Sequence, residues 1–171
     1  MKYELSFLVI IVVAIIGMIS AVSGSVQTFP SDFGKIQIDA PYTLTPSSGS
    51  SGDVLNLVKP GGEKPVVNIV MSDSYGMDLA IFAESHIGED KSYEEVSTKD
   101  GHRMLFYTMD EGTDIDGKPI YDFAGFIDYV KEKGVIVDVF GTSKAVAYGQ
   151  IVATFDRDAF LSISKSFAFI E

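Results

Sequence analysis

The alternation of apolar and polar residues predicts a series of short strands along most of the chain. Ile36 and Ile38 alternate with polar neighbours, which is typical of a strand with one buried face. Further strand patterns are found at residues 54–58, 66–71, 93–98, 102–109, 120–130 and 135–140. Glycine-containing turns separate successive members of this series, and residues 142–153 favour a turn and a short strand. We therefore expect about seven strands in hairpin order.

One segment in the middle of the chain changes to a helical period. The residues at i, i+3, i+4, i+7 and i+8 lie on one face of a helix of about three turns, and they are Leu79, Phe82, Ala83, His86 and Ile87. Ser72 or Ser74 can cap its start, and Gly88 can end it.

A second helix is predicted near the end of the chain. Asp156 suits an N-cap, and Phe155 and Phe160 are spaced as a hydrophobic staple around it. Strands and helices do not alternate in a repeated β-α-β order, so a parallel sheet is not expected. The pattern indicates a single α+β domain over residues 34–171, with a mostly antiparallel sheet covered by two helices.

The N-terminal segment has a different character. Residues 5–22 (LSFLVIIVVAIIGMISAV) are uncharged, and small residues follow them. Residues 1–24 are therefore read as a hydrophobic helix that is either a signal peptide or a membrane anchor, since 18 residues is near the lower limit for a bilayer span. Residues 25–33 are read as a short tether. We expect a protein at the cell membrane with its domain outside the cytoplasm, or one secreted after cleavage near residue 23.

Charge and cysteine content narrow the range of partners. The chain has 24 acidic and 13 basic residues, a net charge of −11 and no cysteine. Such a surface repels nucleic acid and favours cationic or protein partners. Without cysteine, disulfides, thiol catalysis and lipid attachment through cysteine are excluded.

Three parts of the chain carry a resemblance to a known family. They are the opening strand that ends in Pro41-Tyr42, the hairpin over residues 126–139 and the closing segment over residues 156–167. In this layout the chain resembles the PsbP/Mog1-type α+β sandwich. The resemblance implies a fold and no activity, because members of that fold differ in function.

An acidic segment is the main candidate for metal chemistry. Asp110, Asp114, Asp116 and Asp122 lie close together in the sequence, and Gly117 follows Asp116. Alternate carboxylates followed by glycine resemble part of a calcium loop, although the bidentate glutamate of such a loop is missing. The segment is therefore read either as a calcium site or as an exposed acidic turn between two strands.

Other catalytic motifs are weak. His86 and His102 are the only histidines, and neither has a second histidine at metal-binding spacing. Ser162 and Lys165 form a Ser-x-x-Lys pattern without its companion motifs. We expect a binding or accessory domain rather than an enzyme, with no cofactor. The alternative is a carboxylate-based hydrolase, with or without a divalent cation, or a calcium-binding module that uses residues 110–122.

Overall fold

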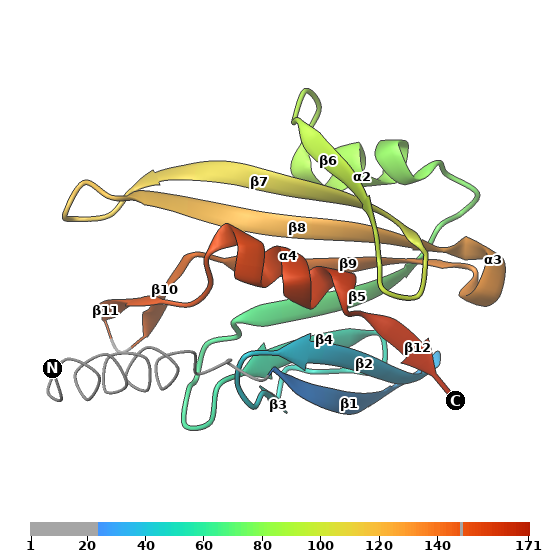
Figure 1. Cartoon of the computed structure of the whole chain (residues 1–171), viewed down its shortest axis with the longest axis horizontal. Coiled ribbons are helices and arrows are strands. Elements are labelled where there is room, and N and C mark those ends of the chain that lie inside the picture. Colours follow the sequence, from blue (N-terminus) through green and yellow to red (C-terminus); the bar gives the residue numbers. More distant parts are fainter. Residues whose placement is uncertain (1–23, 148) are drawn as a thin grey trace, which may run out of the picture.

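A seven-stranded antiparallel sheet forms the centre of the protein (Figure 1). The computed structural model describes residues 24–147 and 149–171. In spatial order the strands are β3 (Thr45–Pro46), β4 (Val54–Val58), β5 (Val67–Asp73), β9 (Val135–Thr142), β8 (Pro119–Tyr129), β7 (Arg103–Thr113) and β6 (Tyr93–Ser97). The edge strands are β3 and β6, and both faces of the strands between them are available for packing.

Two smaller sheets accompany the central one. The first joins β1 (Ser25–Ser31), β2 (Gly34–Ala40) and β12 (Ala168–Ile170), and the second is a ribbon of β10 (Lys144–Ala147) and β11 (Gln150–Ala153). The tether expected over residues 25–33 is thus replaced by a strand over most of its length. Its buried Phe29 lies opposite Ile36 of β2, and Pro30 is tolerated because β1 is an edge strand.

Helices cover the two faces of the central sheet. Helix α2 (Leu79–Ile87) lies on one face, and α4 (Arg157–Lys165) lies on the other, between the central sheet and the β1-β2-β12 sheet (Figure 1). The third described helix, α3 (Val130–Lys133), is a single turn that joins β8 to β9.

The protein has two hydrophobic cores, one on each face of the central sheet, and the alternation along β9 shows which residues belong to each. Val135, Val137 and Val139 belong to the core that contains α4, whereas Ile136 belongs to the core under α2. Successive side chains of a strand point to opposite faces. By this rule the side chain of Asp138 lies on the same face of the sheet as Ile136, the face that α2 covers.

The α+β class, the antiparallel sheet and the two covering helices are confirmed. Asp156 caps α4 as predicted, by accepting a hydrogen bond from the Ala159 amide at 2.7 Å. Helix α2 is capped by Asp78, so the prediction of Ser72 or Ser74 is wrong. Asp78 directly precedes Leu79, and its carboxylate accepts a hydrogen bond from the Ala80 amide at 2.8 Å. Ser74 lies about one helical turn further from the start of the helix.

The predicted N-terminal hydrophobic helix lies outside the described residues. Within residues 24–147 and 149–171, none of the helices combines the length and the apolar character that a membrane crossing requires.

Candidate functional site

The β7–β8 hairpin carries all four carboxylates of the acidic segment, but it distributes them over different surfaces. Asp110 lies opposite Tyr121, and Asp122 lies opposite Met109. Because Tyr121 and Asp122 are consecutive in β8, the side chains of Asp110 and Asp122 point to opposite faces of the sheet. Asp114 and Asp116 lie at the turn of the hairpin.

Asp114 already has its partners inside the protein. Its Oδ1 accepts from the amides of Asp116 at 2.9 Å and Lys118 at 2.8 Å, and its Oδ2 forms an ion pair with Lys144 of β10. The hydrogen bond from Lys144 and those from the two amides lower the pKa of Asp114 below its usual range. The Asp114 carboxylate therefore links the β7–β8 turn to the β10–β11 ribbon through its ion pair with Lys144.

The proposed calcium ligands do not form one cluster. Within the described part of the chain, no three His, Cys, Asp or Glu side chains gather as a metal ion would require. The calcium site over Asp110, Asp114, Asp116 and Asp122 therefore stays a prediction that titration can test.

A groove of about 400 Å³ lies beside the end of α2, on the same face of the sheet. It is lined by residues of β5 and the segment before it, and of α2, β7, β8 and β9: Pro65, Val66, Asn68, His86, Ile87, Met109, Glu111, Asp122, Phe123, Phe140, Gly141 and Thr142. We call it the α2 groove. Its lining contains two carboxylates and neither lysine nor arginine.

Hydrogen-bond acceptors are left without donors in the α2 groove. Asn68 has a buried Oδ1 atom without a hydrogen-bond partner among the described residues. Glu111 is exposed and Asp122 is half-buried, and neither carboxylate takes part in any ion pair between the described residues. A ligand that donates hydrogen bonds would satisfy this set.

His86 adds a further acceptor. Its Nδ1 lies 2.8 Å from the carbonyl oxygen of Phe82, and the ring stacks on the Phe82 ring at 4.3 Å. Since a carbonyl oxygen can only accept, Nδ1 of the neutral ring carries the hydrogen. The Nε2 atom is then left with its lone pair.

Beneath this face lies a carboxyl group that the sequence analysis missed. Asp138 of β9 is 1% exposed, and neither of its oxygens has a hydrogen-bond partner among the described residues. Its neighbours across the sheet are Val70 and Phe126, so its surroundings are apolar. Burial raises the pKa of Asp138 to about 8, which keeps it mainly protonated at neutral pH.

A second polar cluster surrounds His102 at the opposite end of β8. The Tyr129 hydroxyl donates to Asp100, and His102 Nδ1 lies 2.8 Å from the backbone oxygen of Asp128. Burial, followed by the bond to Asp100, raises the pKa of Tyr129. His102 and Asp100 therefore have partners within the fold, which favours a structural role.

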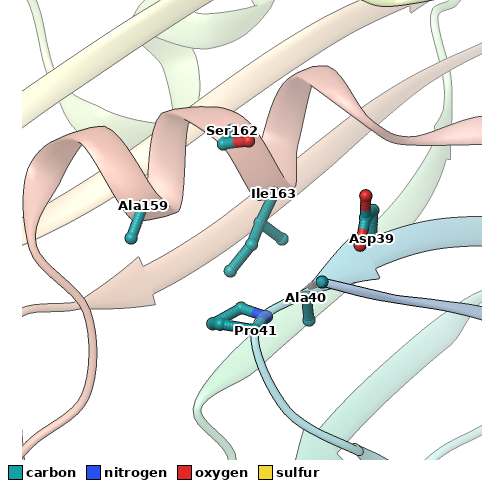
Figure 2. A pocket seen from close by; sticks show the side chains of 7 residues that line it. Asp39, Ala40, Pro41, Ala159, Ser162 and Ile163 are labelled. Carbon is teal, nitrogen blue, oxygen red and sulfur yellow. The ribbon is translucent and has the colours of Figure 1, made fainter. Parts of the chain in front are cut away.

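Figure 2 shows a smaller hollow of about 260 Å³ between the end of β2 and α4. Asp39 and Pro41 border it on one side, and Ala159, Ser162 and Ile163 of α4 border it on the other. Lys165, the partner of Ser162 in the Ser-x-x-Lys pattern, does not line it. The hollow thus does not bring the lysine of the Ser-x-x-Lys pattern to the serine.

Comparison with known proteins adds no family. Neither a protein-family model nor a curated protein matches the chain. On the described residues, the α2 groove combines an unpaired buried acceptor, Asn68 Oδ1, with two carboxylates that take part in none of the ion pairs.

Proposed function

We propose that this protein is a non-catalytic binding domain that receives a cationic group in the α2 groove. The single observation behind this proposal is the convergence of acceptors without any cation: Asn68, His86, Glu111 and Asp122 line one groove that holds no lysine or arginine. An ammonium or guanidinium group has only donors to offer, and it would complete these acceptors.

The walls of the groove suit the stem of such a ligand. Val66, Ile87, Met109 and Phe140 supply apolar surface next to the carboxylates. Lysine and arginine side chains carry apolar methylene stems behind their charged ends, and the net charge of −11 attracts them over a distance. The favoured ligand is a basic peptide or a basic segment of a protein.

The location of this domain is part of the proposal. Residues 1–24 supply a signal peptide or a membrane anchor, and the domain acts outside the cytoplasm as an accessory module. The apolar, uncharged run at residues 5–22 supports this placement.

Titration with a labelled arginine peptide tests the groove. Full-length protein in a neutral detergent is mixed with fluorescein-labelled tetraarginine, and fluorescence anisotropy gives the Kd. The variant Glu111→Gln/Asp122→Asn is expected to weaken binding at least about tenfold, since one hydrogen bond to a charged group contributes about 1.5–3 kcal/mol and about 1.4 kcal/mol corresponds to a factor of ten.

A matched control separates the groove from the general negative charge. Glu63→Gln/Asp116→Asn removes the same charge from exposed positions outside the α2 groove. We expect this control to change the Kd by less than about twofold, because exposed charges contribute little individually. Equal weakening by the two double variants would show a diffuse charge effect and would overturn the proposed function.

A further inference from the structure

Exposed aliphatic side chains gather on two hairpins at one end of the protein. Ile115 at the β7–β8 turn is 93% exposed, and Val146, Ile151 and Val152 of the β10–β11 ribbon are 39–45% exposed. Both hairpins project from the same end of the molecule, at the left of Figure 1. We call this surface the hairpin end. Scattered apolar residues are ordinary on a protein surface, but a group on adjoining projections marks an interaction site.

The ribbon itself is apolar on both of its faces. Val146 lies opposite Ile151, and Ala145 lies opposite Val152, so each face carries aliphatic side chains. The ribbon belongs to neither of the larger sheets. A two-stranded ribbon of this kind is only marginally stable in water, and cover on an exposed face would stabilise it.

The two hairpins are joined into one surface. The ion pair between Asp114 and Lys144 connects the β7–β8 turn to β10. A groove of about 680 Å³ runs between them, and Ile115, Lys118 and Ile151 are among its lining residues. The hairpin end thus presents aliphatic side chains together with Lys118, Asp116 and the Lys144–Asp114 ion pair.

The described chain begins beside α4, the helix that follows the β10–β11 ribbon in the sequence. Gln27 of β1 donates from Nε2 to the Tyr42 carbonyl oxygen at 3.1 Å, and the Tyr42 ring stacks on Phe155 at 5.5 Å. Phe155 follows β11 by two residues. Gly24, the first described residue, borders the hollow of Figure 2 together with Ala159 in the first turn of α4.

Only a short piece of chain separates Gly24 from the predicted anchor. The apolar run ends at Val22, and Gly24 follows two residues later. Two extended residues span at most about 7 Å. An anchor over residues 5–22 would therefore hold Gly24, and with it the side of the domain that carries the start of α4, close to the bilayer surface.

We propose that the hairpin end docks on the lipid bilayer that holds the chain's own N-terminal run. Ile115 and Ile151 enter the boundary between headgroups and acyl chains, while Lys118 lies at the level of the lipid phosphates. Aliphatic side chains flanked by lysine are suited to this boundary. The proposal rests on the predicted anchor and not on cation binding in the α2 groove.

Tryptophan fluorescence tests this docking directly, because the chain contains no tryptophan of its own. Full-length Ile115→Trp and Ile151→Trp proteins are reconstituted into phosphatidylcholine vesicles whose acyl chains are brominated near the headgroup. A ring about 5–10 Å inside the boundary lies near the bromines. We expect each variant to lose roughly half of its emission relative to vesicles without bromine.

Tyr75→Trp is the matched control at the opposite end. Tyr75 is 81% exposed and lies next to Ser74, whose amide donates to Gly134 at the end of α3. Its emission is expected to stay unquenched in the same vesicles. Quenching of both Ile115→Trp and Ile151→Trp, with Tyr75→Trp unaffected, supports the proposal.

Three results would overturn it. The first is a lack of quenching at residue 115 or residue 151, and the second is quenching equal to that of Tyr75→Trp. The third is an emission shift that follows protein concentration in detergent without lipid, because it would show that a second copy of the chain covers the hairpin end. A change in tetraarginine binding bears only on the α2 groove, so failure of either proposal can be recognised separately.

Discussion

Asp138 offers the sharpest test of the energetics of this fold. It is 1% exposed, it lies between Val70 and Phe126, and both carboxylate oxygens lack hydrogen-bond partners among the described residues. In the unfolded chain the group has the ordinary pKa of 3.8, whereas burial raises its pKa in the folded chain to about 8. Between these two values, the folded protein binds a proton that the unfolded chain releases.

The direction of the pH effect follows from this difference. Where the folded state binds more protons, stability falls as the pH rises. The contribution of Asp138 is therefore greatest below about pH 4, declines through the interval up to about pH 8, and is constant above it. At 1.36 kcal/mol per pH unit, the loss by pH 7 is on the order of 4 kcal/mol.

Two substitutions at Asp138 separate charge from packing. Asp138→Asn removes the titration, so the free energy of unfolding should lose this downward slope. Asp138→Leu replaces the carboxyl by an apolar group of similar size, and it should be more stable than the parent protein at pH 8 by several kcal/mol, because it removes an unpaired buried polar group.

Urea unfolding of the full-length protein at pH 5, 6, 7 and 8 measures these differences. The informative quantity is the difference between parent and variant at each pH, because contributions that the two proteins share cancel in it. Asp116→Asn serves as a control, because Asp116 is exposed and should leave the slope unchanged. A parent–variant difference that does not grow with pH would show that burial does not raise the pKa of Asp138 in the folded protein.

Three further predictions concern packing, capping and metal binding. Gly141→Ala should destabilise the fold by about 1–3 kcal/mol in urea unfolding, because the new Cβ would lie 2.1 Å from the Phe160 ring; unchanged stability would contradict this contact. Asp156→Ala should cost about 1 kcal/mol through loss of the α4 cap, and Asp156→Asn should restore most of it. If the acidic turn binds calcium, millimolar calcium should raise the thermal midpoint of the parent and not of Asp114→Ala/Asp116→Ala, and a parent without any shift would exclude the site.

Local patterns were sufficient to predict the elements that depend on local chemistry. The cap at Asp156 and its staple between Phe155 and Phe160 were predicted correctly, since both depend on residues within one helical turn. Strand β1 was not predicted, because its stability comes from pairing with β2 and from burying Phe29. Such pairing is a property of the sheet and has no local pattern.

The candidate site was less predictable for the same reason. Asp122 was named from its acidic neighbours, but the α2 groove also requires Asn68 from β5 and His86 from α2. Sheet pairing brings these separate segments together, and periodicity within one segment cannot indicate it. Asp138 was missed because an acidic residue between valines is typical of a strand with one exposed face, whereas β9 is covered on both faces.

The position of Asp138 also predicts how binding in the α2 groove should depend on pH. Phe140 lines the groove and follows Asp138 by two residues on the same face of β9, a separation of about 7 Å. A guanidinium group bound there would favour the ionised form of Asp138 by on the order of 1 kcal/mol, which is roughly fivefold in Kd. By reciprocity, tetraarginine should bind more tightly at pH 9 than at pH 7, although arginine keeps its charge throughout this range. Asp138→Asn should abolish this gain, and a gain that persists in Asp138→Asn would separate the buried acid from the groove.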